Sequence, residues 1–144
     1  MSTRTARTAW NGTLMEGSGQ VELTSSGAGT FDVTFPKRTA EEADGTSPEE
    51  LIAAAHTSCY AMQLSGVIAA AGGTPVALEV SADVTLRPDP AGGLHITTIA
   101  LTVRGEVEGL DEAGFLAAAE NARTTCPVSK ALTGTEITLA ASLA

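Results

Sequence analysis

The chain has few aromatic and few cationic residues. The first shortage limits the composition of its core, and the second limits the partners that it can bind. Only 3% of its 144 residues are aromatic, so the core has to be built mostly from Val, Ile, Leu and Ala. Lys and Arg total 8 against 17 Asp and Glu, which gives a net charge of −9. No basic footprint is available to neutralise phosphate groups. The composition therefore argues against a nucleic acid or an anionic membrane as a partner.

Export and membrane signals are also lacking. The N-terminal residues MSTRTARTAWNG carry charges with no apolar run behind them, unlike a secretion signal. The longest apolar stretch, Leu51 to Ala71, is broken by His56, Gln63 and several small polar residues, which makes it a poor transmembrane helix. We expect a cytoplasmic protein. Thiols stay reduced in that compartment, so a structural disulfide is not expected, whereas a transient catalytic disulfide remains possible.

The hydropathy pattern predicts an α+β fold in one domain, residues 1–144. A chain of this length that is 43% hydrophobic and 17% charged is typical of a globular domain. Alternating apolar and polar residues predict roughly six strands, in antiparallel sheets. The expected strands are 4–16, 19–26, 29–36, 76–88, 93–107 and 135–143. Two main helices are expected at 48–71 and 111–125, with a helical turn at 127–132.

The start of the first main helix separates two adjacent glutamates by role. Ser47 fits the N-cap position and Pro48 the first helical position. Glu50 then falls at the third helical position, where it completes a capping box with Ser47. Glu50 is thereby explained structurally, whereas Glu49 gains only a modest benefit from the positive end of the helix. Glu49 is therefore the residue left free for other work.

Apolar and small residues cover nearly every side of this helix rather than a single stripe. A helix that is apolar all round is buried all round, yet one sheet can cover only one of its sides. We therefore expect the remaining side to pack on a second copy of the chain. The sequence predicts a homodimer with a central pair of helices.

The chain contains two cysteines, and the surroundings of the first leave its role open. Cys59 falls in the middle of the first main helix, where a free cysteine commonly acts as a small buried hydrophobe. His56 lies one turn earlier on the same face. His56 and Cys59 could also supply two metal ligands, but two ligands do not make a metal site.

Cys126 carries a clearer chemical signal. Pro127 follows it, which moves Cys126 out of the helical conformation and makes it the N-cap of the turn at 127–132. Free N–H groups at such a position stabilise a thiolate. Local chemistry therefore favours Cys126 as the more reactive thiol, and the alternative is a simple cap in place of a serine.

Two longer motifs resemble those of the OsmC/Ohr family of osmotically inducible and organic hydroperoxide resistance proteins. They are GTSPEELIAAAHTSCYAMQLS and NARTTCPVSKAL, which contain Cys59 and Cys126. The similarity spans almost the whole chain, and the sequence HTSC that ends at Cys59 resembles the OsmC branch more than the Ohr branch. The resemblance implies an OsmC-like fold, with antiparallel sheets packed around long central helices in an intertwined homodimer. It also implies a peroxiredoxin-like hydroperoxide reductase.

The resemblance assigns roles to four residues. Cys59 corresponds to the peroxidatic cysteine, which attacks the peroxide, and Cys126 to the cysteine that resolves it; local chemistry favours the reverse order. Glu49 matches the glutamate of the family's PEE motif, and Arg38 in FPKRT matches its arginine. A neighbouring arginine lowers a thiol pKa, and a carboxylate fixes the guanidinium. Without the resemblance, Arg38 and Lys37 would be interpreted as solvated loop charges.

This chemistry requires no bound metal, haem or flavin. An organic hydroperoxide, or hydrogen peroxide, would oxidise Cys59 to a sulfenic acid that condenses with Cys126 to a disulfide. An external dithiol or a lipoylated protein would then reduce the disulfide. Two alternatives remain: a non-catalytic ligand-binding dimer with structural cysteines, and a metal-binding dimer that uses His56, Cys59 and Cys126.

Helix geometry adds an expectation about where the site lies. Glu49 and Cys59 are ten residues apart on one helix. That spacing places them about 15 Å apart along the axis and rotates them by roughly 80°. An arginine bonded to Glu49 cannot readily reach Cys59 of the same helix. We therefore expect Arg38 and Glu49 of one subunit to complete the site that contains Cys59 and Cys126 of the other.

Overall fold

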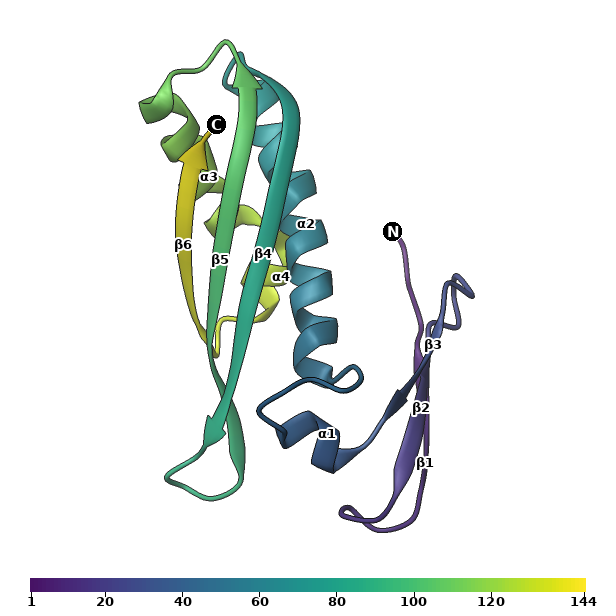
Figure 1. Cartoon of the computed structure of the whole chain (residues 1–144). Helices are drawn as coiled ribbons and strands as arrows, with labels where there is room; N and C mark the ends of the chain where they lie inside the picture. Colours follow the sequence, from purple (N-terminus) through teal and green to yellow (C-terminus); the bar gives the residue numbers. More distant parts are fainter. The chain divides into compact units, whose positions relative to one another are not determined.

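A computed structural model describes all residues, 1–144, and has an α+β architecture (Figure 1). Contacts divide the chain into two compact units, Met1–Leu51 and Ile52–Ala144. Each unit contains one three-stranded sheet. The α+β class and the six strands are those that the sequence predicts. That residues 1–144 form a single domain stays a prediction.

Unit 1 opens with a small antiparallel sheet in the order β1-β2-β3. Its strands are β1 (Arg7–Asn11), β2 (Ser18–Glu22) and β3 (Thr30–Val33). A short helix, α1 (Phe35–Thr39), follows where the sequence predicts the end of a strand and a polar loop. Thr34 caps α1 by accepting a hydrogen bond from the N–H of Lys37 at 3.3 Å, and Pro36 lies in the first turn. Arg38 therefore lies in a regular element rather than in the predicted loop.

Helix α2 (Pro48–Ala70) begins as predicted. Ser47 Oγ accepts a hydrogen bond from the N–H of Glu50 at 3.2 Å, which is one half of the expected capping box. The other half is replaced, because the Glu50 carboxylate accepts a hydrogen bond from the Thr46 hydroxyl at 2.6 Å. Gly72 follows the last turn with a φ of 89°, a conformation that glycine adopts without strain.

One stripe of α2 is fully buried within the chain. His56, Tyr60, Leu64 and Ile68 recur every fourth residue and form this stripe, whereas Met62 is 75% exposed. By length and composition alone α2 could cross a membrane, with 22% of its apolar window buried. The core helix of a soluble protein passes the same test. The exposed apolar part of α2 is the surface that the predicted homodimer would cover.

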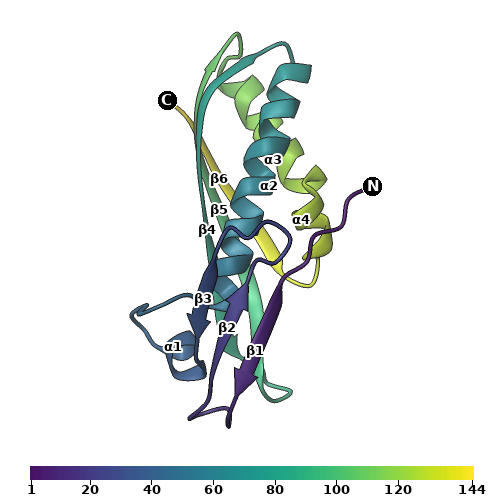
Figure 2. The ribbon, with the colours of Figure 1, turned by 90° about the vertical axis from the view of Figure 1, so that its right-hand side faces the viewer.

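Unit 2 is a sheet in the order β4-β5-β6 with helices on one face. Its further elements are β4 (Thr74–Pro88), β5 (Leu94–Glu108), α3 (Glu112–Thr125), α4 (Pro127–Ala131) and β6 (Glu136–Leu143). Helices α2, α3 and α4 lie on the same side of this sheet (Figure 2). Asp111 caps α3 by accepting a hydrogen bond from the N–H of Gly114 at 2.8 Å. The connection from α3 to α4 passes through Cys126, at the junction of the two helices.

The direction of the last strand corrects the sequence prediction. Strands β4 and β5 pair antiparallel, as expected of a hairpin. Strand β6 pairs parallel to β5, with Ile99 opposite Ile137 and Leu101 opposite Leu139. A parallel neighbour requires a crossover, and α3 with α4 provides it. Alternation of apolar and polar residues does not encode strand direction, so this difference leaves no signal in the sequence.

The core of unit 2 lies between the sheet and the helices. Tyr60, Leu101, Val103 and Phe115 are among its buried members. Gly105 on β5 makes room for Phe115, because a Cβ atom at this glycine would lie 2.6 Å from the phenyl ring. The Phe115 ring of α3 therefore lies directly on the strand. This contact helps to fix α3, and with it the position of the residues that follow, against the sheet.

Candidate active site

The two cysteines meet at the start of α4. The Sγ atoms of Cys59 on α2 and Cys126 lie 3.1 Å apart, and both are free thiols. Cys126 is fully buried and Cys59 is partly exposed. The structure thus joins two residues that are far apart in the sequence into one sulfur pair, with one member open to a reactant.

Contacts between α2 and α3 hold this pair in place. The buried hydroxyl of Tyr60 donates to the carbonyl of Ala119 at 2.9 Å. Gln63 donates to the Thr125 hydroxyl at 3.0 Å, one residue before Cys126. Pro127 opens α4 and leaves Cys126 as its N-cap, as the sequence predicts. The sulfurs therefore face each other from a helix and a helix junction that hydrogen bonds hold in place.

The two thiols differ in acidity within one chain. Burial tends to raise the pKa of Cys126, but the N–H groups of Ser129 and Val128, the Cys59 thiol and the Ser129 hydroxyl all favour its thiolate. Together they hold the pKa of Cys126 below its ordinary value. Burial and the neighbouring Cys126 raise the pKa of Cys59. The structure of a single chain thus agrees with the sequence analysis, in which the position of Cys126 before Pro127 stabilises its thiolate.

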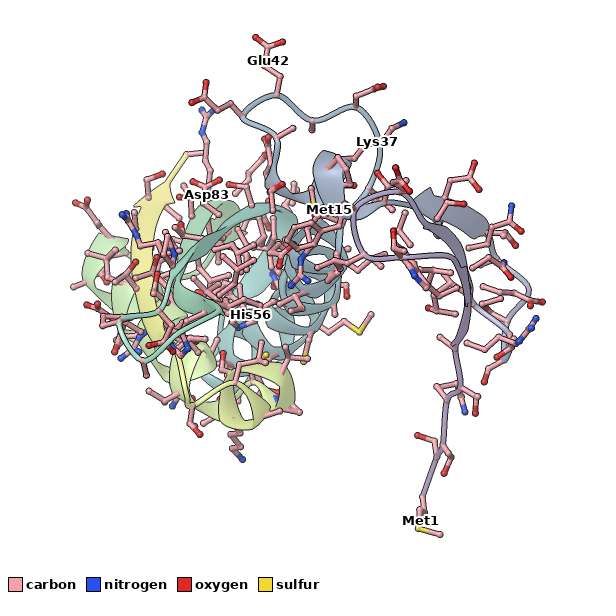
Figure 3. The ribbon with its side chains drawn as sticks, turned by 90° about the horizontal axis from the view of Figure 1, so that it is seen from below. Met1, Met15, Lys37, Glu42, His56 and Asp83 are labelled. Atoms are coloured by element: carbon pink, nitrogen blue, oxygen red, sulfur yellow. The ribbon has the colours of Figure 1, made fainter.

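His56 points into unit 2 (Figure 3), where it lies against Ser129. Its Nε2 atom lies 2.7 Å from the Ser129 hydroxyl, and burial lowers the pKa of the imidazole. Nδ1 is buried without a hydrogen-bond partner. The chain contains no group of three or more His, Cys, Asp or Glu side chains arranged to hold a metal ion. The neighbour that the structure gives to His56 Nε2 is the Ser129 hydroxyl.

Arg38 and Glu49 form a second pair, within unit 1. Arg38 Nε donates to Glu49 Oε1 at 3.0 Å and to Oε2 at 3.2 Å, and Nη2 donates to Oε1 at 2.7 Å. The Glu49 residue is only 7% exposed. Such a forked contact fixes the plane of the guanidinium as well as its position. Nη1 is left over and can bind another oxygen atom.

The neighbouring cation is arranged differently. Lys37 Nζ lies 3.5 Å from the carboxylate of Asp44, and both side chains are well exposed. An exposed pair of this kind contributes little to stability. Of the two cations in FPKRT, the structure therefore brings Arg38 and not Lys37 to Glu49. From the sequence alone, the contact between Arg38 and Glu49 is expected only because of the family resemblance.

An apolar groove of about 370 Å³ lies beside the Arg38 side chain in unit 1. Arg38 is the only charged residue among those that line it. The apolar lining includes Trp10, Leu14, Val21, Phe35 and Leu51. The groove can accept a hydrophobic group while its one cation binds a polar end. Sequence reasoning missed it, because its lining comes from three strands and two helices.

A model of the OsmC-like protein family matches residues 41–140. The chain belongs to this family. The matched region contains Glu49, Cys59 and Cys126, whereas Arg38 precedes it. Relatives with curated names agree with the match. The chain is 40% identical over 130 residues to "Peroxiredoxin OsmC" of Escherichia coli (strain K12), covering 90% of this chain and 89% of the relative.

A second relative belongs to the other branch. The chain is 32% identical over 106 residues to "Organic hydroperoxide resistance protein OhrA" of Bacillus subtilis (strain 168), covering 72% of this chain and 73% of the relative. Membership in the OsmC/Ohr family is thereby confirmed. Identity to the OsmC protein is higher and extends over more of the chain. This agrees with the HTSC sequence, which resembles the OsmC branch more than the Ohr branch.

Solved structures support the fold. An organic hydroperoxide resistance protein from Elizabethkingia anophelis superposes with a TM-score of 0.78 at 26% identity, covering 99% of both chains. OhrB of Bacillus subtilis superposes with a TM-score of 0.75 at 27% identity, covering 96% of this chain and 98% of that one. The OsmC-like fold predicted from the two cysteine motifs is confirmed.

Proposed function

We propose that the protein is a thiol-dependent peroxidase that reduces organic hydroperoxides, and also hydrogen peroxide, through Cys59 and Cys126. The relatives named peroxiredoxin and organic hydroperoxide resistance protein support an enzyme of this type. The single observation that carries the roles of the two cysteines is the 3.1 Å contact between their sulfur atoms. A sulfenic acid formed at either sulfur has its partner thiol within reach.

Cys59 is the proposed peroxidatic residue. It is the more exposed member of the pair, so a peroxide can approach it while Cys126 stays covered. The Cys59 thiolate attacks the distal peroxide oxygen, the O–O bond breaks, and an alcohol or water leaves after taking up a proton. Cys59 becomes a sulfenic acid, and Cys126 then displaces hydroxide from it to form a disulfide.

An external dithiol resets the enzyme. One thiol of the reductant attacks the Cys59–Cys126 disulfide and forms a mixed disulfide with one cysteine while the other leaves as a thiolate. The second thiol of the reductant then attacks this mixed disulfide, so the reductant leaves as a cyclic disulfide and both cysteines are restored. A lipoylated protein carries such a dithiol and is the proposed physiological partner. The reaction uses no bound metal, haem or flavin, since the sulfur atoms carry all of the electrons that the peroxide receives. We place this activity in the cytoplasm.

The site is proposed to be complete only in a homodimer. Within one chain, burial and Cys126 raise the pKa of Cys59, whereas an attacking thiolate needs a cation nearby. Arg38 is preorganised by Glu49 and still has Nη1 free. Glu49 lies about 15 Å from Cys59 along α2, so we assign the Arg38–Glu49 pair of one subunit to the cysteine pair of the other. The exposed apolar surface of α2 would be buried between them.

The apolar groove beside Arg38 favours an organic peroxide over hydrogen peroxide. Its lining is aliphatic and aromatic, with one guanidinium. The organic group of a hydroperoxide would lie against this lining, and its oxygen atoms would meet Arg38. Burying such a group gains about 25 cal/mol for each Å² of apolar surface removed from water. Hydrogen peroxide has no group that can make this contact.

One assay tests the proposed function. Purified protein is given cumene hydroperoxide or hydrogen peroxide, with dihydrolipoamide or glutathione as reductant, and peroxide loss is followed. We expect fast turnover with cumene hydroperoxide and the dithiol, slower turnover with hydrogen peroxide, and little with the monothiol. The Cys59→Ser variant is the control for uncatalysed loss. Wild-type rates equal to those of this variant would leave the non-catalytic dimer as the better account.

A further inference from the structure

We propose that His56 and Ser129 are positioning residues for Cys126: His56 fixes the Ser129 hydroxyl so that it donates a hydrogen bond to the Cys126 sulfur during attack on oxidised Cys59. This inference rests on the proposed function, in which Cys126 resolves the sulfenic acid. It concerns the second chemical step only. The first attack, on the peroxide, is made by Cys59 and does not need this chain of contacts.

The three residues are buried, and Ser129 belongs to the short helix that Cys126 caps. His56 and Cys126 are fully buried, and Ser129 is 5% exposed. His56 Nε2 lies 2.7 Å from Ser129 Oγ. Ser129 lies in the first turn of α4, three residues after the N-cap Cys126, and its hydroxyl favours the thiolate of Cys126. Water has little access to these groups, so a lost protein hydrogen bond has no ready replacement.

The tautomer of His56 follows from its surroundings. Burial lowers the pKa of His56, which keeps the imidazole neutral with a single proton. On Nδ1 that proton would be a buried donor with no acceptor, since Nδ1 has no partner. On Nε2 it is donated to Ser129 Oγ. We therefore assign the proton to Nε2.

This tautomer determines the role of Ser129. Its oxygen accepts from His56, so its own proton is free for the sulfur of Cys126. Ser129 also occupies the third position after the N-cap, the position whose N–H commonly donates to a cap side chain. Both the backbone and the side chain of Ser129 therefore support a negative charge on the same sulfur.

No charged side chain is among the groups that hold the pKa of Cys126 below its ordinary value. Cys59 acts on the pKa of Cys126, and Tyr60 on α2 lies close enough to respond to the charge of Cys126. Burial raises the pKa of Tyr60, which keeps it neutral. Arg123 is bonded to Glu120 and to the carbonyl of Ile137. The groups that favour the thiolate of Cys126 are neutral hydrogen-bond donors.

The step that these donors assist is balanced. The Cys126 thiolate supplies an electron pair to Cys59 Sγ, the S–O bond of the sulfenic acid breaks, and hydroxide leaves. The hydroxide combines with the proton that the Cys126 thiol released, which gives water. The sulfur of Cys126 is oxidised and that of Cys59 is reduced to the disulfide level. The peroxide of the first step is the only oxidant required.

Two measurements on the dimeric protein test the inference. The first is the lifetime of the Cys59 sulfenic acid after one equivalent of cumene hydroperoxide, in Ser129→Ala and His56→Leu proteins. One hydrogen bond to a charged group supports an expected lengthening of about tenfold to a hundredfold, with the rate of peroxide attack unchanged. The second is the pH titration of thiolate ultraviolet absorbance in a Cys59→Ser background, where both variants should raise the pKa of Cys126.

A conservative variant and a matched control separate positioning from simple packing. His56→Gln keeps an N–H donor and should restore most of the resolution rate that His56→Leu loses. Thr124→Val removes an exposed hydroxyl two residues before Cys126 and should change neither measurement. An unchanged sulfenic acid lifetime in Ser129→Ala, or equal slowing of attack and resolution, would overturn the proposal. If wild-type protein formed no Cys59–Cys126 disulfide, the proposed function would fail, while the titration would still report on the contact.

Discussion

The sulfur atoms of Cys59 and Cys126 lie 3.1 Å apart as free thiols. A disulfide bond of about 2.05 Å requires these sulfurs to approach by about 1 Å. Cys126 is buried in the core, and Cys59 is its partly exposed partner. This geometry suits a pair in which the partly exposed thiol reacts with the peroxide and the buried thiol then forms the disulfide.

The first prediction separates the two thiols. Cys59→Ser should abolish peroxide turnover, because the only other thiol, Cys126, is buried. Cys126→Ser should retain a single round of attack and then accumulate oxidised Cys59, which excess peroxide drives to sulfinic acid. Mass spectrometry of the intact protein after one and ten equivalents of peroxide distinguishes these states. Fast attack retained by Cys59→Ser and lost by Cys126→Ser would reverse the assignment.

The second prediction concerns the guanidinium. Arg38→Ala should raise the pKa of Cys59 in the dimer, because a lost cation destabilises the thiolate only. A pKa that is higher by about one reduces the thiolate fraction at neutral pH about tenfold, so attack should slow at neutral pH much more than at alkaline pH. Alkylation of Cys59 as a function of pH measures the change in its pKa. Lys37→Ala is the matched control, since Lys37 contacts Asp44 and not Glu49.

The third prediction tests the shared site. Subunits carrying Cys59→Ser and subunits carrying Glu49→Ala should each be inactive, or nearly so, as homodimers. A mixed dimer should contain one working site, made from the intact cysteine pair of one chain and the intact Arg38–Glu49 pair of the other. In an equal, fully exchanged mixture about half of the dimers are mixed, so activity should rise toward about one quarter of the wild-type value. Verified mixed dimers without activity would place the whole site within one chain.

The fourth prediction concerns the packing that holds α3. Gly105→Ala should destabilise the protein by about 1–3 kcal/mol, the usual cost of overpacking a core. The added methyl group would lie 2.6 and 2.7 Å from two carbons of the Phe115 ring. Gly134→Ala is the control, because a Cβ atom there meets nothing within 4 Å. Urea denaturation compares the two, and equal stabilities would contradict the contact.

The fifth prediction follows from the buried imidazole. Burial holds the pKa of His56 below its ordinary value of 6.5, so below that pH the unfolded chain binds a proton that the folded chain does not. Stability should therefore fall with falling pH, by at most about 1.4 kcal/mol per pH unit for this one proton. His56→Gln should flatten this part of the urea-derived stability profile, and exposed His95→Gln should not. Parallel profiles for all three proteins would exclude His56 as the source.

Much of the fold could be predicted because its signals are local. Ser47 and Pro48 mark the start of α2, Gly72 marks its end, and alternation locates the long strands β4 and β5. The direction of β6 could not be predicted, since the same alternation fits a parallel or an antiparallel partner. Helix α1 is too short to show a helical period, and its place in the sequence is consistent with a polar loop.

The site was predictable only in part for a similar reason. Local chemistry identified Cys126 as the more acidic thiol, and the structure of one chain agrees. The pairing of Cys126 with Cys59, and of Arg38 with Glu49, came from the family resemblance, because spacing alone does not pair residues across a fold. The contact between His56 and Ser129 joins residues 73 positions apart, and nothing in the sequence near either residue indicates it.

The most direct test of the account is to locate the oxidised sulfur after one turnover without reductant. Protein is treated with one equivalent of cumene hydroperoxide, quenched with a thiol-blocking reagent, and analysed by non-reducing electrophoresis and peptide mass spectrometry. The account predicts a Cys59–Cys126 disulfide within single chains, in an amount equal to the peroxide consumed. Peroxide consumed with both cysteines still blocked as free thiols, or with disulfides only between chains, would contradict it.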